Sequence, residues 1–480
     1  MLLALILAGC INAAQVPSMS ASQTHSDVTE THYPATPTPT PTDTPTSTPI
    51  PPVEISYYHL RFVYSSTSDW ADIEFLEPQR LVSVRVLSIV GTPQTANADL
   101  PFFRLYRPVS DLYQEPEVSM SVDVAILPED VAEPLEVQSQ HGAIGGSGLE
   151  VYYVAEDTMI KISEFNHYWV DSQHPDTSLR KFSIDLQELG NYQPAMTTIQ
   201  VTSNEKMVWA VYYPWIAWDL EADCTDHPAV PYVYSRPEVL SRDTIEGQIE
   251  LAKSAGIDGF MVSWFDDPIS DENLRLLLEA AEEQDFKITI YMEILLDGDL
   301  NPSIESWIEH AVQWYGDHPA YMQFEGKPLI VIYSSEIAPN STWEEIFGRL
   351  EEKGVYASYL GSGYNLSNFD TFIGVHQYVV LGTPGLPQIY QTISQATRYY
   401  SIFQDDSTTK KIFVATVHPG FNDCPYGGDS VYTRDDGNFY REMWQTAIES
   451  DPDWIMITSW NEFGESTHIE PSEFFGTVYL

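Results

Sequence analysis

The sequence has little positive charge. Its 480 residues include 22 lysines and arginines against 70 aspartates and glutamates, which gives a formal net charge of −48. Such a negative surface repels the phosphate backbone of nucleic acids, so we expect no nucleic-acid partner. The acidity by itself predicts only a well-solvated surface.

Cysteine is also scarce, which limits the metal sites and disulfide scaffolds that the chain could form. There are three cysteines, no Cys-x-x-Cys pair and no cluster of histidines, so we predict no metal site and no cofactor. Cys224 and Cys424 each follow a predicted strand in the second half of the chain. In an oxidising compartment they could form a bridge, and two free buried thiols are the alternative.

The apolar N-terminal segment, residues 1–10, is too short to cross a bilayer as a helix. It is typical of the core of a signal peptide, although the usual positive charges in front of it are missing. Its end, Leu7 to Cys10, resembles a bacterial lipobox, in which Cys10 would carry the lipid and become the mature N-terminus. A plain secretory signal is the alternative. Both predict export, and the first predicts a lipid anchor as the only attachment to a membrane.

Two further regions precede the second half of the chain. Residues 11–53 are rich in threonine and proline, which predicts a disordered, extended linker. Residues 54–202 contain short apolar runs with alternating β-branched and aromatic residues, as at 58–64 and 81–87. This pattern predicts a β-sandwich accessory domain, which either binds glycans or acts as a structural cap.

From residue 207 onward, apolar strands alternate with helical patterns. The predicted strands are 208–213, 259–263, 287–291, 329–333, 356–360, 371–375, 411–417 and 454–458. Eight near-continuous apolar strands joined by crossovers predict an α/β fold, a closed (β/α)8 barrel of the TIM type over 207–480. An open doubly wound sheet is the alternative, but no glycine-rich phosphate loop follows the first strand.

The predicted eighth strand lies close to the end of the sequence at Leu480. A complete barrel should place a helix after this strand. We therefore expect the barrel domain to be truncated at its C-terminus. The alternative is that the predicted sandwich covers the gap.

Polar and aromatic residues gather where the predicted strands end. They are Tyr212, Tyr213, Trp264, Glu293, Tyr333, His376, Trp460, Asn461, Glu462 and Glu465. In a barrel of this type, the C-terminal ends of the strands carry the chemistry. Paired acids suit glycoside cleavage, because one carboxyl protonates the leaving oxygen while the other acts as base or nucleophile. Any single residue could be structural, but together they predict a sugar-binding cleft with Glu462 and Glu465 as the catalytic pair.

Several motifs in this half of the chain are similar to those of glycoside hydrolase family 99, whose type activity is endo-α-mannosidase. They lie, in order, at 212–215, 256–264, 291–293, 318–320, 326–328, 418–423, Arg434 with Gly437 and Tyr440, and 459–470. The resemblance covers more than half of the chain and none of the predicted sandwich. It implies an endo-acting and retaining hydrolase of α-linked mannose-type glycans. The reaction would pass through a 1,2-anhydro sugar rather than a covalent glycosyl-enzyme.

The resemblance also implies separate roles for the two acids. Glu462 would deprotonate the 2-hydroxyl of the substrate, whereas Glu465 would protonate the leaving oxygen and later activate water. Glu465 must then hold a proton near neutral pH, through burial or a neighbouring carboxylate. Glu462 should stay ionised to act as a base.

Five further residues take binding roles by the same resemblance. Glu293 and Trp264 would line a neighbouring sugar subsite. Tyr213, Asn461 and Arg434 would orient the reacting ring. The partner that these roles imply is a polysaccharide or oligosaccharide substrate, and we expect the protein to act as a monomer.

Two departures widen the substrate question. His468 stands where the family usually has glutamine, and we place it among the substrate-binding residues. The stretch 460–466 also resembles the acidic motif of fungal α-1,3-glucanases, and family-99-like domains occur in polysaccharide-biosynthesis proteins. The alternative functions are therefore an α-1,3-glucanase-like hydrolase and a surface lipoprotein that binds glycans without cleaving them.

Overall fold

The structure is a computed structural model of the protein. It describes residues 53–108, 110–111, 117–142, 145–155, 158–168, 178–199, 205–214, 224–296, 298–404 and 411–480. The predicted signal segment, the lipobox with Cys10 and almost all of the linker lie outside the described residues. In the part that is described, no helix is both long enough and apolar enough to cross a membrane.

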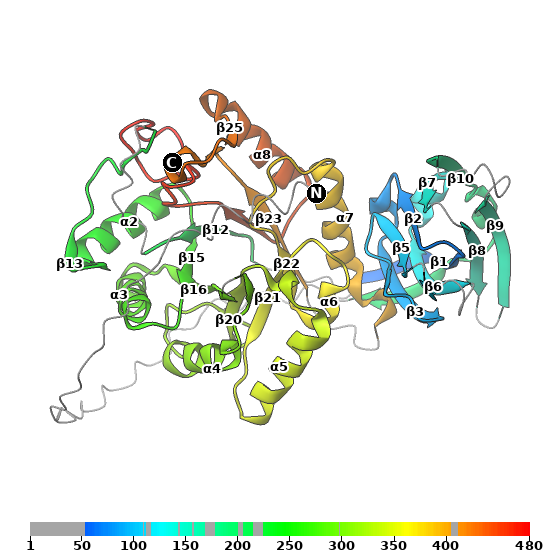
Figure 1. The fold of residues 1–480 in the computed structure, drawn as a ribbon, viewed down its shortest axis with the longest axis horizontal. Coiled ribbons are helices and arrows are strands. Elements are labelled where there is room, and N and C mark those ends of the chain that lie inside the picture. The colour runs from blue at the N-terminus through cyan, green and yellow to red at the C-terminus, as the bar shows by residue number, and fades with distance from the viewer. Residues whose placement is uncertain are drawn as a thin grey trace. The chain divides into compact units, whose positions relative to one another are not determined.

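Two antiparallel sheets form the β-rich part of the chain, which is blue to cyan in Figure 1. Their strands are β1 (Val53–Ser66), β2 (Trp70–Phe75), β3 (Ser83–Val90), β4 (Thr95–Asn97), β5 (Phe102–Tyr106), β6 (Val118–Ile126), β7 (Leu135–His141), β8 (Gly146–Ala155), β9 (Thr158–Tyr168), β10 (Arg180–Ile184) and β11 (Ala195–Ile199). One sheet has the order β3-β6-β1-β8-β9, with β11 paired to β1, and the other has the order β10-β7-β2-β5-β4.

The two sheets share one apolar core. Alternate residues of strands such as β1, β2 and β7 are buried in it, as expected for sheets that face solvent on the other side. Phe62 of one sheet contacts Phe75 and Phe103 of the other through ring pairs 5.7 and 5.8 Å apart. This arrangement is the predicted β-sandwich.

Eight parallel strands close into a barrel in the second half of the chain (Figure 1). They are β12 (Met207–Tyr212), β15 (Gly259–Trp264), β16 (Lys287–Met292), β20 (Lys327–Ile332), β21 (Ser358–Ser362), β22 (Gly374–His376), β23 (Ile412–Val417) and β26 (Trp454–Ile457). Each strand pairs with the next along the chain, and β26 pairs with β12 to complete the ring. Each of the eight predicted strands overlaps one of these. The closed barrel is confirmed, and the open sheet is excluded.

Helices surround the ring of strands (Figure 1). They are α2 (Arg242–Ser254), α3 (Pro268–Gln284), α4 (Ile304–Tyr315), α5 (Asn340–Glu352), α6 (Asn368–Thr371), α7 (Leu386–Tyr399) and α8 (Asn438–Glu449). The start of α3 shows why they form where they do, because Asp267 accepts from the first free backbone N–H groups and Pro268 occupies the first turn. Residues 458–480, after β26, form turns and loops. The expected truncation remains a prediction.

Short paired strands decorate the connections of the barrel. They are β13 (Tyr234–Arg236), β14 (Val239–Leu240), β17 (Leu295–Leu296), β18 (Asp299–Leu300), β19 (Gln323–Phe324), β24 (Phe421–Asn422) and β25 (Val431–Tyr432). The hairpin of β24 and β25 follows β23. Because it follows a barrel strand, it lies at the end of the barrel where the strands finish.

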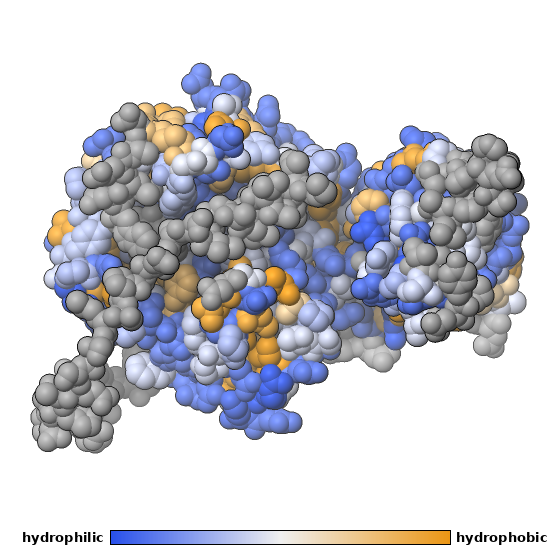
Figure 2. Space-filling model, in the orientation of Figure 1, coloured by the Kyte–Doolittle hydropathy of each residue, from blue (hydrophilic) through white to orange (hydrophobic). Residues whose placement is uncertain are grey.

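The side chains of each barrel strand alternate between two apolar cores. On β12, Trp209 and Val211 belong to the core inside the barrel, whereas Ala210 and Tyr212 belong to the layer between strands and helices. The outer surface is mostly hydrophilic on the face shown in Figure 2, in keeping with the many acids. The alternation decides which of the residues predicted at the strand ends point into the barrel.

Candidate active site

Three carboxyl groups interact electrostatically at the C-terminal end of the barrel. Glu462 and Glu465 lie in the loop after β26, and Glu293 directly follows β16. Burial raises the pKa of Glu293 to about 7, against a lowering hydrogen bond from Ser263 at 2.7 Å, and the charge of Glu465 adds to the rise. Like charges therefore gather where the sequence predicts the chemistry.

Glu462 is the most deeply placed of the catalytic pair, with 5% of its surface exposed. Burial raises its pKa well above the ordinary value for a glutamate, and the charges of Glu465 and Glu293 add to the rise. Its backbone N–H donates to the Ser459 hydroxyl at 2.8 Å, and the Tyr426 hydroxyl donates to its Oε1 at 3.0 Å. Burial among other acids favours the protonated form of Glu462 in the unliganded site, whereas its predicted role as a base requires the ionised form. That role stays a prediction.

Tyrosines from inside the barrel border these acids. The Tyr213 hydroxyl donates to the Tyr378 hydroxyl at 2.6 Å, and both lie in the inner core. Burial raises the pKa of Tyr213 and of Tyr378 well above the ordinary value, and the charges of Glu462 and Glu465 add to both shifts. Tyr333 is partly exposed, and its ring lies 5.8 Å from that of Tyr378. Tyr213 and Tyr333 thus lie on the inner side of the barrel, as the prediction of a cleft requires.

Asn461 is fully buried and pairs with the backbone of Tyr213. Its Oδ1 accepts from the Tyr213 N–H at 2.8 Å, and its Nδ2 donates to the Tyr213 carbonyl at 2.9 Å. The amide therefore fixes the position of Tyr213 at the end of β12. The structure thus gives Asn461 a supporting contact, and its predicted contact with the sugar ring stays a prediction.

Three predicted binding residues point away from the inside of the barrel. Tyr212, Trp264 and Trp460 are fully buried in the layer between strands and helices. The Tyr212 hydroxyl donates to Gln248 at 2.7 Å, and the Trp264 indole donates to Asp271 at 3.2 Å. The prediction that these three side chains line the cleft is wrong. The alternation along β12 and β15 sends Tyr212 and Trp264 outward, whereas Trp460 lies beyond the end of β26.

His376 is also fully buried, but its side chain lies on the inner side of the strands, beside Tyr291. Its Nδ1 lies 2.8 Å from the Gly361 carbonyl, and its Nε2 lies 3.0 Å from the Tyr291 hydroxyl. Burial lowers the pKa of His376 to about 4, so the ring is neutral near pH 7. The structure assigns His376 to holding Tyr291 in the inner core, and not to the cleft.

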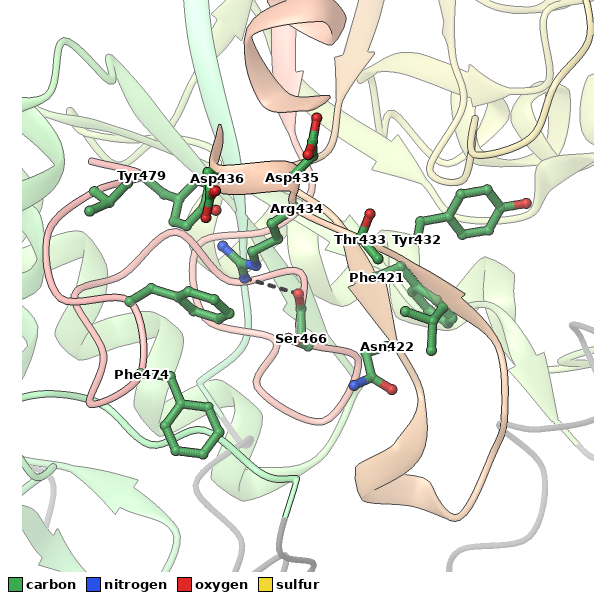
Figure 3. A pocket seen from close by; sticks show the side chains of 13 residues that line it. Phe421, Asn422, Tyr432, Thr433, Arg434, Asp435, Asp436, Ser466, Phe474 and Tyr479 are labelled. Carbon is green, nitrogen blue, oxygen red and sulfur yellow. Dashed lines mark hydrogen bonds between the residues drawn. The ribbon is translucent and has the colours of Figure 1, made fainter. Parts of the chain in front are cut away.

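Arg434 supports the loop that follows Glu465. Its guanidinium donates to the carbonyls of Ser466 and His468 at 2.9 and 2.7 Å, and Figure 3 shows the first of these bonds. The same group lies over the rings of Phe475 and Tyr479. A cavity of about 610 Å³ adjoins it, lined partly by Ser466 and Tyr479 but by none of the three carboxyl residues. Arg434 therefore holds the loop that follows Glu465, and its contact with the sugar ring stays a prediction.

His468 is buried beneath the same loop. Its Nε2 lies 3.0 Å from Asp226 Oδ2, and its ring stacks on Phe463 with centroids 4.1 Å apart. Burial lowers the pKa of His468 to about 4. The residue that replaces the usual glutamine thus has structural partners, and its contact with substrate stays a prediction.

Cys224 and Cys424 form a disulfide across 200 residues of sequence. The bridge joins the connection after β12 to the hairpin after β23, so the first of the two open alternatives holds. Tyr426, two residues beyond Cys424, reaches Glu462 from this hairpin. Sequence reasoning missed Tyr426, because a tyrosine in an irregular loop carries no periodic signal.

One group among the described residues could supply three metal ligands. The candidate atoms of Asp266, Asp271 and His310 lie within 4.8 Å of one another. Hydrogen bonds already account for this grouping, since His310 Nδ1 lies 2.6 Å from Asp266 and the Tyr315 hydroxyl donates to Asp271 at 2.8 Å. The cluster contains none of the three glutamates described above.

Comparisons with known proteins point to one family. The family model described as "Glycosyl hydrolase family 99" matches residues 231–475, just over half of the chain. The glycoprotein endo-alpha-1,2-mannosidase of Rattus norvegicus is 27% identical over 274 residues, which cover 50% of this chain and 57% of that protein. The ascus wall endo-1,3-alpha-glucanase of Schizosaccharomyces pombe is 20% identical over 264 residues, 49% of this chain and 55% of that protein. This chain thus spans a little over half the length of these relatives.

Among solved structures, the GH99 endo-alpha-mannosidase from Bacteroides thetaiotaomicron is similar to this chain. The match is 24% identical with a TM-score of 0.47. It covers 55% of this chain and 87% of that one.

Proposed function

The chain belongs to glycosyl hydrolase family 99, and from this premise we propose that the protein hydrolyses α-linked, mannose-type glycans at linkages inside the glycan. One observation carries the proposal. Glu462, Glu465 and Glu293 share one electrostatic environment at the C-terminal end of the barrel, with two inward-facing tyrosines beside them. Crowded carboxyls with raised pKa values are how a site keeps one acid protonated near pH 7.

The two acids of the loop after β26 divide the work. Glu462 removes the proton of the sugar 2-hydroxyl, whose oxygen then forms a bond to C1 and closes a 1,2-anhydro ring. As the C1 bond to the leaving oxygen breaks, Glu465 gives that oxygen its proton. Glu465 next takes a proton from water while the water oxygen attacks C1. The C1 bond to the 2-oxygen breaks, and Glu462 returns its proton to that oxygen. The configuration at C1 is inverted twice and hence retained.

This cycle requires the proton to start on Glu465. In the unliganded structure, burial and neighbouring charge raise the pKa of Glu462 and so oppose its ionisation. The cycle therefore requires that Glu462 is ionised when a glycan is bound. The hydrogen bond from Tyr426 favours this ionisation, because it stabilises the ionised form of Glu462.

The substrate class is supported by the relatives. Several of them are named as glycoprotein endo-alpha-1,2-mannosidases. A second candidate is an α-1,3-glucan, which is favoured by the match to the ascus wall endo-1,3-alpha-glucanase and by the motif at 460–466. The two substrates share the α-configuration at C1 but differ in the linkage position and in the configuration at C2. The 2-hydroxyl lies trans to the leaving oxygen in an α-mannoside and cis to it in an α-glucoside, so the cycle above applies to the mannose-type substrate.

Oligosaccharide release is the direct test of the proposal. The purified protein is incubated with an α-1,2-linked mannan and with α-1,3-glucan, and new reducing ends are measured beside Glu465→Gln. Release by the wild type that the variant lacks supports the hydrolase and identifies its substrate. Saturable binding without new reducing ends would instead establish the glycan-binding alternative.

We also propose that the protein is exported and held at the cell surface by lipid on Cys10. The lipobox-like residues 7–10 and the threonine- and proline-rich tract behind them support this. The disulfide supports export as well, since such bonds persist in oxidising compartments. Expression in a bacterial host should yield a membrane-bound form, and Cys10→Ser should release it. Recovery of both forms in the soluble fraction would refute the anchor.

A further inference from the structure

One side chain outside the predicted site makes a direct contact with the proposed base. Tyr426 ends the short 3-10 helix η7 (Cys424–Tyr426), within the β24–β25 hairpin. Its hydroxyl donates to Glu462 Oε1 at 3.0 Å. Its ring lies over Gly464, where an added Cβ would come within 2.2 Å of the ring. The loop after β26 thus leaves room for this ring beside the carboxyl.

Two contacts fix the hairpin that carries Tyr426. The disulfide joins Cys424 to Cys224 in the connection after β12. The Asn422 N–H donates to the carbonyl of Glu465 at 2.8 Å, which links the hairpin to the catalytic loop. The disulfide is therefore the covalent member of a frame that fixes where Tyr426 can reach.

The other titratable groups around Glu462 do not replace this hydrogen bond. The groups that interact with the Glu462 carboxyl are Glu465, Glu293, Tyr213 and Tyr378. The His468 side chain interacts with the backbone of Glu462. Negative charge on the two glutamates opposes ionisation of Glu462. The Tyr426 hydroxyl acts in the opposite direction, because it donates to the carboxylate.

We propose that Tyr426 is a positioning residue that orients Glu462 and favours its ionised form, and that the Cys224–Cys424 disulfide holds Tyr426 in this contact. The inference rests on the proposed function of Glu462 as the base. It assigns to the bridge a role in catalysis, in addition to its role in stability. A change in the bridge should then act on the reaction through Tyr426.

The first test is Tyr426→Phe, which keeps the ring over Gly464 and removes only the hydroxyl. A hydrogen bond to a charged group is strong enough to move the acidic limb of the kcat/KM profile up by about 1 to 2 pH units. At pH 6, kcat should fall about tenfold or more, with little change in KM. The matched control is Tyr432→Phe, an exposed tyrosine of the same hairpin, which should leave the profile in place.

The pH profile also separates the two possible roles of Glu462. Movement of the acidic limb means that Glu462 works ionised, as a base. Movement of the basic limb alone would mean that Glu462 works as the acid, and would overturn the proposal. A profile identical to that of the wild type would overturn it as well. Incorporation of 3-fluorotyrosine at 426, whose hydroxyl is more acidic, should shift the acidic limb downward.

A second measurement does not depend on turnover. Carboxyl infrared bands are followed against pH, and the band of Glu462 is assigned by its loss in Glu462→Gln. Tyr426→Phe should raise the midpoint of this band by about 1 to 2 pH units. If the wild type cleaves no glycan but the midpoint shifts, the proposed function fails and the contact stands. An unchanged midpoint sinks the contact whatever the activity.

A double-mutant cycle tests the disulfide. Cys224→Ser should shift the acidic limb in the same direction as Tyr426→Phe, by a smaller amount. Combined with Tyr426→Phe it should add no further shift, because both changes remove one contact. Additive shifts would overturn the role of the bridge. If Cys224→Ser does not fold, mild reduction of the folded wild type and of Tyr426→Phe gives the same comparison.

Discussion

Two buried glutamates of one segment, Glu462 and Glu470, behave differently although they lie eight residues apart. Both are at most 6% exposed, and burial raises the pKa of each. Glu470 accepts hydrogen bonds from the Tyr232 hydroxyl and from Gln248. Glu462 instead faces two further carboxyl groups. A raised pKa therefore indicates only that a carboxyl is buried, whereas the crowding of acids at the C-terminal end of the barrel indicates the proposed catalytic site.

The difference follows from the side of the strand layer that each residue occupies. Gln248, which holds Glu470, also accepts from Tyr212 in the layer between strands and helices. Tyr213, the next residue along, turns inward toward Tyr378 and the acids. The hydrogen bonds of Gln248 with Tyr212 and Glu470 therefore join helix α2 to the barrel. The hydrogen bond between Tyr213 and Tyr378 lies beside the proposed catalytic acids.

Loss of an inner carboxyl, that of Glu465, should give the largest decrease in kcat. Glu465→Gln is expected to lower kcat by about 10² to 10⁴, the usual contribution of a positioned acid or base. The melting temperature should stay constant or rise, because the change removes repulsion between neighbouring acids. Initial rates and thermal unfolding of the same preparation check both parts. Retained activity would show that the crowded acids are not the reacting groups.

The next largest effect should be on the pH dependence of stability, which distinguishes the outer carboxyl of Glu470 from the inner carboxyls. The pKa of Glu470 is about 7 in the folded protein, above the ordinary value of 4.5. The folded state therefore binds more protons than the unfolded state between these values, so unfolding free energy falls as pH rises from 4.5 to 7. The part due to Glu470 is about 3 kcal/mol. It appears as the difference between wild type and Glu470→Gln in urea unfolding from pH 4 to pH 8.

Removal of the outer carboxyl should cost stability without costing catalysis. Glu470→Ala leaves the donors on Tyr232 and Gln248 without their acceptor. At pH 5 this should lower the unfolding free energy by about 2 kcal/mol, the typical penalty for unpaired buried groups. Denaturation and steady-state kinetics measure the two effects. A loss of kcat as large as that of Glu465→Gln would erase the distinction between the two acids.

The smallest effects should come from the adjacent tyrosines. Tyr212→Phe removes a hydrogen bond to Gln248 and should cost about 1 kcal/mol of stability with unchanged kcat. Tyr213→Phe removes the bond to Tyr378 beside the acids and should lower kcat about tenfold. Parallel kinetics of the two variants check the contrast. Equal losses of kcat would mean that the alternation does not separate core from site.

Much of the fold follows from local pattern, but the facing of individual side chains does not. The eight strands are detectable because apolar runs such as that of β23 recur between helical patterns. Strands buried on both faces show no polar alternation, so the sequence could not tell Tyr212 from Tyr213. Trp264 was misplaced for the same reason.

The missed features of the site depend on contacts distant in sequence. Tyr426 reaches Glu462 from a hairpin fixed by a bridge that spans 200 residues. The protonation of Glu462 depends on burial and on neighbours that only the closed barrel brings together. The acid pair itself was predictable, because both members lie in one motif directly after the last strand.

The most direct test of the central claim is the anomeric form of the first product. Hydrolysis of an α-1,2-linked mannan is followed by proton NMR within the first minutes, beside Glu465→Gln. The account predicts new α-anomeric reducing ends from the wild type, before mutarotation, and none from the variant. Product that first appears as the β-anomer, or equal release by the variant, would contradict retention by this pair of acids.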